Sequence, residues 1–507
     1  MATFPFSRPI KRVLVANRGE IAVRVIRGCR DAGIESVALY SDPDIEWPHV
    51  RLADFAMPLA GSTAAETYLN FEKVLNAARA SGADAIHPGY GFLSENPEFA
   101  QACRVAGITF IGPTPEAMRL LGSKTSARQV MQAAGVPVVP GALKALPTAE
   151  LVAEAASDIG YPIALKAVSG GGGKGMRVVQ RAEDVEAAFR TASSEAAAAF
   201  GDGSLYVERY LERPRHVEVQ ILADHHGNAV HLGERECSIQ RRHQKVIEES
   251  PSPVVNEELR ARLGQAAVNA ALASGYHNAG TVEFLLDSHG EFFFLEVNAR
   301  LQVEHPVTEL VTGIDLVREQ LRVAAGEPLG YGQEAIQHRG AALECRIYAE
   351  DALNRYMPSV GKVLEARLPH GPGVRVDGAL ESGLEISVYY DPLLAKLCTW
   401  GENRAQAIAR MRRALQELVV LGPITNAPLH EWILSRPDFI AGDTDTGWLE
   451  RVWPDERADA PEAMLGALAL LIDEQRAAGS PPEPSPNEIE RISSWARAGR
   501  VAGMRTR

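Results

Sequence analysis

The chain has few cysteines and no long apolar segment. Its five cysteines, Cys29, Cys103, Cys237, Cys345 and Cys398, are far apart, odd in number and form no C-x-x-C pair. This pattern argues against a disulfide framework or a zinc site and predicts reduced thiols in a cytoplasmic protein. No apolar run approaches the roughly 18 residues of a membrane-spanning helix, and the N-terminus lacks the apolar core of a signal peptide.

Basic residues are in deficit, and two common nucleotide motifs are missing. The 52 Lys and Arg residues against 65 Asp and Glu give a net charge of −13, which argues against nucleic-acid or membrane-surface partners. No G-x-G-x-x-G follows the first predicted strand, so a dinucleotide-binding fold has no support. The P-loop pattern G-x-x-x-x-G-K-[ST] is absent as well.

The chain does have the length and pattern of a multidomain α/β protein. Its 507 residues correspond to about three domains. Short apolar strands at 12–16, 34–40, 85–87 and 108–111 alternate with helical segments. That alternation predicts an N-terminal α/β domain with a parallel sheet. Later residues mix helices with strands of period-2 alternation, so the fold class is α/β and α+β.

A glycine run lies between two predicted strands, at 161–167 and 177–179. Gly170, Gly171, Gly172 and Gly173 are followed by Lys174, and Lys166 lies in the first strand. Consecutive glycines let backbone N–H groups surround an anion without Cβ clashes. A flexible surface hairpin is the plainer interpretation, but the flanking lysines favour a phosphate-binding lid.

Two acidic residues fall on one predicted hairpin. A strand at 281–286 is followed by the turn signal Asp287-Ser288-His289-Gly290 and a returning strand. A tight turn would place Glu283 opposite Phe294 and diagonal to Glu296, with all three side chains on one face. Two carboxylates sharing a small volume suit Mg²⁺.

The returning strand continues as an alternating segment from 296 to 304. Its polar row is Glu296, Asn298, Arg300, Gln302 and Glu304, and the intervening residues are apolar. A half-solvated strand with surface ion pairs is the plain alternative. Two amides, a guanidinium and two acids on one face favour a chemical site instead.

Three further features carry candidate residues, each with a structural alternative. His216 alternates with Glu218 and Gln220, although an isolated histidine would more often be a buried, hydrogen-bonded residue. The cationic segment 240–245 is either a solvated loop or a phosphate or oxyanion clamp. Arg346 lies inside a predicted strand, where an arginine usually pairs with a carboxylate.

Taken in order, these motifs resemble the biotin carboxylase family of the ATP-grasp superfamily. The resemblance runs from about residue 11 to about 440. Its matching stretches are 15–22, 87–95, 111–113, 122–124, 169–176, 215–218, 240–249, 296–309, 344–346, 389–391 and 425–426. It implies an N-terminal α/β domain (1–122), linker helices with an ATP-grasp lid (123–212), a core with a C-terminal mixed domain (213–445) and a C-terminal extension (446–507).

The resemblance also implies the reaction, its cofactors and its partners. ATP with Mg²⁺ or Mn²⁺ and bicarbonate would form carboxyphosphate, whose CO₂ carboxylates biotin on a carrier protein. The chain contains no Met-Lys-Met or similar biotinyl-lysine motif, so biotin is expected on another polypeptide. The implied partners are a biotin carboxyl carrier protein or domain, a second copy in a homodimer and a carboxyltransferase subunit.

Residue roles follow from the resemblance, position by position. Lys124 and Lys166, with Gly171, Gly172 and Gly173 of the glycine loop, should contact ATP. Glu208 and Leu211 should line the adenine pocket, His216 and Gln240 should line the ribose end, and His243 should also contact the nucleotide. Glu283, Glu296 and Asn298 should hold the metals. Lys245 and Arg300 should hold bicarbonate, Glu304 should be the base, and Arg346 should stabilise the charged oxygen of biotin.

Two departures and two alternatives accompany this assignment. Arg209 stands where a lysine is often found near adenine, and residues 42–49 lack the expected Ala-Asp-rich form. A different ATP-grasp ligase of the carbamoyl-phosphate type would share the lid and metal acids, but not the row from Arg300 to Pro306. A non-catalytic ATP-binding scaffold should have lost a lysine, a metal acid or the base, and none is missing.

Overall fold

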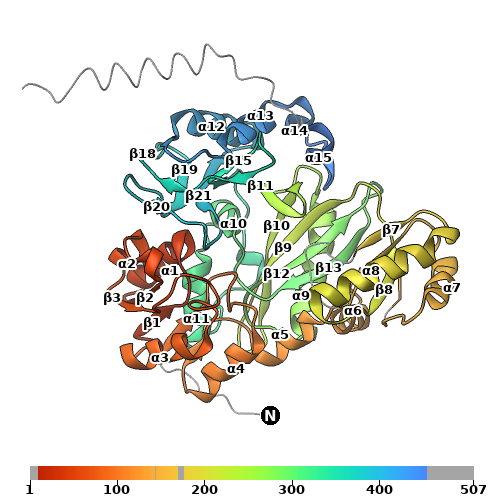
Figure 1. The fold of residues 1–507 in the computed structure, drawn as a ribbon, viewed down its shortest axis with the longest axis horizontal. Coiled ribbons are helices and arrows are strands. Elements are labelled where there is room, and N and C mark those ends of the chain that lie inside the picture. Colours follow the sequence, from red (N-terminus) through yellow and green to blue (C-terminus); the bar gives the residue numbers. More distant parts are fainter. Residues whose placement is uncertain (1–8, 143, 169–175, 454–507) are drawn as a thin grey trace, which may run out of the picture. The chain divides into compact units, whose positions relative to one another are not determined.

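The N-terminal part of the fold is a parallel sheet covered by helices. The computed structural model describes residues 9–142, 144–168 and 176–453. The strands are β1 (Arg12–Val15), β2 (Glu35–Tyr40), β3 (Phe55–Pro58), β4 (Ala85–His87) and β5 (Thr109–Phe110), in the order β3-β2-β1-β4-β5. The helices are α1 (Gly19–Asp31), α2 (Pro48–Leu52), α3 (Phe71–Ser81) and α4 (Pro97–Val105) (Figure 1). The predicted parallel sheet is confirmed.

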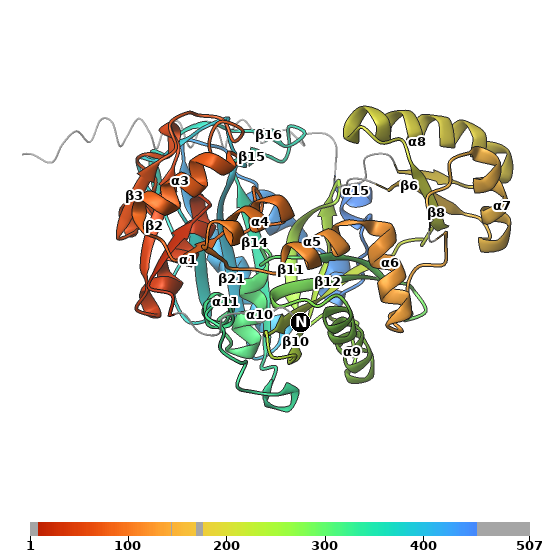
Figure 2. The ribbon, with the colours of Figure 1, turned by 90° about the horizontal axis from the view of Figure 1, so that it is seen from below.

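A short connection leads to a small antiparallel layer. Helices α5 (Pro115–Gly122) and α6 (Lys124–Ala133) precede strands β6 (Ile163–Ala167), β7 (Arg177–Val179) and β8 (Leu205–Arg209), in the order β7-β6-β8. Helices α7 (Ala149–Ile159) and α8 (Val185–Phe200) pack on these strands (Figure 2). Gly171, Gly172 and Gly173 lie outside the described residues, so their predicted role stays a prediction.

The largest element is an eight-stranded antiparallel sheet. Its order is β13-β12-β9-β10-β11-β14-β21-β19. The bounds are β9 (Arg215–Ala223), β10 (Ala229–Arg241), β11 (Gln244–Ser250), β12 (Asn278–Leu286), β13 (Phe292–Asn298), β14 (Ala341–Tyr348), β19 (Val374–Gly378) and β21 (Leu393–Gly401). Because β12 lies between β9 and β13, residues of these three strands share one surface.

Helices and minor strands complete the described chain. The helices are α9 (Glu257–Ala273), α10 (His305–Thr312), α11 (Leu316–Ala324), α12 (Arg404–Glu417), α13 (Ala427–Ser435), α14 (Pro437–Ala441) and α15 (Trp448–Val452). Three two-stranded pairs are β15 (Glu350–Asp351) with β16 (Met357–Pro358), β17 (Gly361–Lys362) with β20 (Glu385–Ile386), and β18 (Glu365–Arg367) with β22 (Val419–Leu421).

Two apolar cores lie along one face of the large sheet. Val219, Val282 and Phe294 pack with Leu263 of α9 and Met131 of α6. A second core joins α12 and α13 to β11, β14 and β21. The expected mixture of a parallel α/β part and a mixed α+β part is therefore confirmed.

The part of the chain that the structure describes has neither a candidate membrane-spanning helix nor a disulfide. Within the described ranges, no helix combines the length and apolarity needed to cross a bilayer. All five cysteines are buried free thiols.

Candidate active site

A single cavity gathers the predicted residues. It has a volume of about 580 Å³, which is within the usual range for a small-ligand site. Every predicted site residue in the described ranges lines it: Lys124, Lys166, Glu208, Leu211, His216, Gln240, His243, Lys245, Glu283, Glu296, Asn298, Arg300, Glu304 and Arg346. They come from segments more than 200 residues apart, so the fold brings them together.

The predicted metal acids lie closer together than the turn argument implied. Glu283 on β12 lies directly opposite Glu296 on β13, and a bulge follows, after which Phe284 pairs with Phe294. The prediction that Phe294 faces Glu283 was therefore wrong. Phe294 points into the apolar core, because one extra residue in β13 reverses the alternation between Phe294 and Glu296.

The alternating strand predicted for 296–304 is also shorter than expected. β13 ends at Asn298, and Glu304 is the N-cap residue of α10. β13 pairs with β12 only as far as Asn298, and the backbone beyond it has no strand partner. We call residues 299–304, which end at the predicted base Glu304, the base loop. Its residues are held mainly by side chains, and Ala299 N donates to Glu95 at 3.0 Å.

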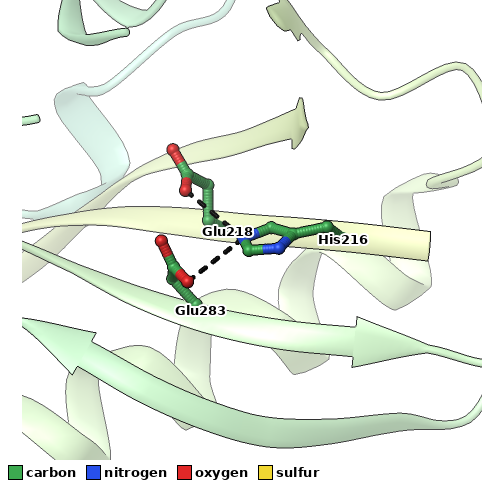
Figure 3. A group of neighbouring side chains, drawn as sticks. All are labelled: His216, Glu218 and Glu283. Atoms are coloured by element: carbon green, nitrogen blue, oxygen red, sulfur yellow. Dashed lines mark ion pairs between the residues drawn. The ribbon is translucent and has the colours of Figure 1, made fainter. Parts of the chain in front are cut away.

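Glu283 accepts contacts from several strands. Lys245 Nζ lies 2.8 Å and Gln302 Nε2 3.0 Å from Glu283 Oε1. His216 Nε2 lies 3.2 Å from Glu283 Oε2 and 3.7 Å from Glu218 Oε2. Figure 3 shows the imidazole facing both carboxylates. Burial lowers the pKa of His216, but the carboxylates of Glu283 and Glu218 together outweigh burial and raise it to about 9.

Lys245 is the cation at the centre of the site. Its Nζ contacts Glu218, Glu283 at 2.8 Å and Glu304 at 2.6 Å. Burial lowers the pKa of this ammonium, but the three carboxylates outweigh that effect and raise its pKa well above the ordinary value. The segment 240–245 is the tip of the β10–β11 hairpin, with its turn at Arg242 and His243, and the side chain of its lysine is only 12% exposed.

Glu304 lies between two cations. It contacts Lys245 at 2.6 Å, and Arg346 NH2 approaches its second oxygen at 3.1 Å. Arg346 Nε also pairs with Glu248 at 2.6 Å. Burial raises the pKa of Glu304, but Lys245 and Arg346 outweigh it, so the net shift is downward. The carboxylate is therefore ionised at neutral pH and able to accept a proton.

Arg300 faces the cavity from the base loop. Its Nε donates to Glu95 at 2.8 Å, and its NH2 donates to Asn298 Oδ1 at 2.9 Å. The guanidinium is thus oriented by one acid from the N-terminal part and one amide from β13. Glu95 was not among the predicted site residues, although it ends the matching stretch 87–95.

The end of the cavity that holds the predicted nucleotide contacts, called here the nucleotide end, is formed by α6, β6 and β8. Lys166 on β6 and Arg128 on α6 both pair with Glu208 on β8, and the distance between Arg128 and Glu208 is 3.0 Å. Lys124 begins α6, and burial lowers its pKa despite the attraction of Glu296. Two lysines beside a partly apolar wall are suited to a polyphosphate attached to an aromatic base.

The donor set near β13 fits a hard divalent cation. Glu296 lies beside Glu283 and is half-buried. Burial and the neighbouring Glu283 raise the pKa of Glu296. Two facing carboxylates and the amide oxygen of Asn298 are oxygen ligands of the kind that Mg²⁺ prefers. His216, Glu218 and Glu283 also approach closely enough to share an ion, as do Glu218, Cys237 and Glu304.

Several buried charges that support the site had no predicted role. Arg235 is fully buried and pairs with Glu218 at 2.6 Å, and it also donates to Gln220 and Gln302. Glu248 holds Arg346. The signal was present for Arg235, because an arginine inside a strand implies a fixed partner. Which acid it would meet depends on strand order, which local patterns do not reveal.

Family models match three consecutive parts of the chain. The biotin carboxylase N-terminal domain matches residues 9–118, and the biotin carboxylase C-terminal domain matches residues 344–451. The ATP-binding domain of the carbamoyl-phosphate synthase L chain matches residues 123–331 between them. The two flanking models distinguish the chain from a carbamoyl-phosphate-type ligase.

Similar proteins of known name share nearly half of the aligned residues. Biotin carboxylase of Nostoc sp. is 49% identical over 441 residues, covering 87% of this chain and 99% of that protein. The structure of Rhizobium etli pyruvate carboxylase is 44% identical with a TM-score of 0.85, and the match covers 91% of this chain and 42% of that one. The second relative is therefore a longer carboxylase, of which this chain corresponds to one part.

A further solved structure has the same fold. It is the biotin carboxylase domain dimer of Hydrogenobacter thermophilus 2-oxoglutarate carboxylase, in complex with MgADP, ADP and bicarbonate. It is 47% identical with a TM-score of 0.84, and the match covers 88% of this chain and 98% of that one. With the family models, the named relatives and the shared fold in agreement, the chain belongs to the biotin carboxylase family.

Proposed function

We propose that this chain catalyses the ATP- and bicarbonate-dependent carboxylation of biotin carried by another polypeptide. The observation that supports this most directly is the placement of Glu304. Its ionised carboxylate contacts Lys245 and Arg346 in a cavity that also reaches Lys124 and Lys166. A base, two cations and a polyphosphate site in one cavity match the needs of a reaction between bicarbonate and ATP.

The first step activates bicarbonate. Bicarbonate loses its proton only well above neutral pH, so a positioned base is needed. Glu304 accepts the proton of the bicarbonate O–H, and Lys245 and Arg300 stabilise the resulting negative charge. The freed oxygen then bonds to the γ-phosphorus of ATP, and the bond from that phosphorus to the β-phosphate oxygen breaks to release ADP.

The nucleotide end holds ATP during that step. Lys124 and Lys166 would neutralise phosphate charge, Glu208 and Leu211 would border the adenine, and His216, Gln240 and His243 would lie toward the ribose and phosphates. Glu283, Glu296 and Asn298 would hold Mg²⁺ or Mn²⁺. A bound divalent cation supplies charge neutralisation and orientation of the phosphates.

The second step carboxylates biotin. Carboxyphosphate breaks down to CO₂ and phosphate, the N1′ atom of biotin bonds to the carbon of CO₂, and the N1′ proton leaves to phosphate. Negative charge develops on the ureido oxygen of biotin as N1′ becomes nucleophilic. Arg346 would stabilise that oxygen, because a guanidinium binds a localised negative charge with paired donors.

The biological setting is proposed at a coarser level. One solved relative is a domain dimer, and another is a pyruvate carboxylase more than twice as long as the part that this chain matches. We infer that a biotin carboxyl carrier protein delivers biotin to the cavity, that a carboxyltransferase subunit completes the carboxylation of an acyl-CoA, and that two copies of this chain associate.

ATP hydrolysis with Mg²⁺ and bicarbonate, with and without free biotin, tests the proposal. We expect biotin to stimulate turnover in the wild type. Glu304→Gln should lower kcat by roughly 10²–10⁴-fold, because the base is lost. Arg346→Ala should lower biotin-dependent turnover by roughly 10²–10³-fold, because one oxyanion donor is lost.

Matched surface variants serve as controls. Glu257→Gln and Arg181→Ala remove side chains that are 92% and 68% exposed, so both should keep wild-type turnover. Absence of any biotin dependence in the wild type would refute the proposal. Turnover that requires ammonia instead would favour a carbamoyl-phosphate-type ligase.

A further inference from the structure

The base loop is held from several sides. Glu95 fixes Ala299 N at 3.0 Å and Arg300 Nε at 2.8 Å, and Gln302 donates to Glu283 at 3.0 Å. These anchors come from the N-terminal part of the chain and from β12. Val303 precedes the proposed base and also lines the cavity, but its apolar side chain offers no polar anchor.

The backbone of Val303 is held by a buried lysine on β21. Lys396 Nζ donates to the Val303 carbonyl oxygen at 3.0 Å. The same ammonium lies 3.2 Å from Glu20 Oε2 in the first turn of α1. The side chain of Lys396 is 0% exposed and that of Glu20 is 2% exposed. One ammonium thus joins α1, β21 and the base loop, and both helices α1 and α10 pack against β21 (Figure 1).

Stability alone gives little reason for this pair. Removing two charges from water is costly, and a buried ion pair can often be replaced by apolar side chains without loss of stability. Burial raises the pKa of Glu20 to about 7 even though Lys396 opposes the shift. The interaction of Glu20 with Lys396 therefore only partly offsets the loss of solvation. The contact of Lys396 with Val303 is the one that points to a role beyond stability.

From this geometry we infer that Lys396 is a positioning residue for the reaction, acting through the Val303 carbonyl to set the backbone of Glu304. The inference rests on the proposed function. A carbonyl fixed one residue before Glu304 limits rotation of the backbone that carries the base. The carboxylate then meets Lys245 at 2.6 Å and Arg346 at 3.1 Å.

The expected effect is on turnover rather than on nucleotide affinity. A displacement of about 1 Å in a reacting group can cost roughly 100-fold in rate. Lys396→Met in the full chain keeps a long side chain but removes the donor. We expect biotin-dependent kcat to fall about 10–100-fold, while the KM for ATP changes less than threefold, because Lys124 and Lys166 lie on other elements.

A double variant separates positioning from folding. Glu20→Gln with Lys396→Met removes both charges, so the Tm should recover toward the wild-type value after the loss caused by Lys396→Met alone. The Val303 carbonyl still lacks its donor, so kcat should stay low. Recovery of kcat together with the Tm would overturn the inference, because the lysine would then be needed only to neutralise Glu20.

Arg260→Met is the matched control. Arg260 on α9 also pairs with a buried acid, Glu234 at 2.8 Å, and also donates to a backbone carbonyl, that of Val255 at 3.2 Å. It does not line the cavity, so its loss should lower the Tm with kcat maintained. If Lys396→Met keeps the wild-type kcat, the positioning role is refuted but the proposed function is not. If the wild type shows no biotin dependence, the proposed function itself is refuted.

Discussion

At the scale of single residues, the site is a set of buried charges with more than one partner each. Lys245 contacts three carboxylates, and Arg346 is shared between Glu248 and Glu304. Such sharing makes each charge sensitive to the protonation of its neighbours, because electrostatic interactions are stronger away from water. The charge on Glu304 therefore also depends on Glu248, which pairs with Arg346 and does not line the cavity.

Glu248→Gln tests that dependence. Burial raises the pKa of Glu248 to about 7, so its carboxyl is ionised above that pH and protonated below it. Once it is protonated, Arg346 interacts more strongly with Glu304, which weakens the base. We expect wild-type kcat to fall as pH decreases through about 7. In Glu248→Gln, which resembles the protonated form, kcat should be lower at pH 8 than in the wild type. It should not fall further as the pH decreases through about 7.

The neighbouring acid is the control for that pH profile. Glu249 is also buried but pairs with Arg404, at 2.5 Å, on the opposite face of β11. Glu249→Gln should therefore keep the step near pH 7 even if it lowers the Tm. An unchanged step in Glu248→Gln would show that another group produces it.

Residue types could be predicted from the sequence, but their partners could not. The carboxylates Glu283 and Glu296 were expected to be near each other because hairpin pairing is local. Glu20, by contrast, lies in the matching stretch 15–22 and had no predicted partner, yet it pairs with Lys396. Such contacts depend on how distant elements pack, and period or spacing within one segment carries no information about them.

At the scale of elements, the connection between the linker and β8 is unusually close. Gly141 forms a bridge with Glu208, and a Cβ on Gly141 would lie 2.5 Å from Val207 O and 2.7 Å from Glu208 Cα. Both neighbours are backbone atoms, so an added methyl group must displace the strand. Because β8 carries Glu208, and Leu211 follows it, that displacement reaches the nucleotide end of the cavity.

Gly141→Ala should therefore weaken nucleotide binding as well as folding. We expect a loss of roughly 1–3 kcal/mol in unfolding free energy from overpacking. We also expect the Kd for MgADP, measured by calorimetry, to rise severalfold. Gly122→Ala at the end of α5 is the control, because nothing lies within 4 Å of its added Cβ. Equal effects of both changes would contradict this explanation.

At the scale of the whole molecule, all described site residues belong to one compact unit. That unit spans Met1–Trp453, and the three family models together end at residue 451. The Nostoc relative aligns over 99% of its own length with 87% of this chain. The family models and the described residues of the cavity therefore all lie within the first 453 residues.

A chain shortened to residues 1–453 should keep its activity on free biotin. We expect kcat and the KM for ATP to stay within about twofold of the full chain, because no described residue of the cavity lies beyond Thr446. Steady-state ATP hydrolysis with bicarbonate and biotin measures this. A collapse of kcat with an unchanged Tm would show that residues 454–507 contribute to the reaction.

The bulge in the β12–β13 hairpin has a consequence for which sequence changes this enzyme can tolerate. The extra residue of β13, rather than the turn 287–290, decides that Glu296 faces Glu283 while Phe294 faces the core. Residues added to the turn would lengthen it and leave that pairing intact. Deletion of one residue from β13 would instead point an acid into the apolar core, because side chains alternate faces along a strand. Natural length variation should therefore collect in the turn and be absent from the strand.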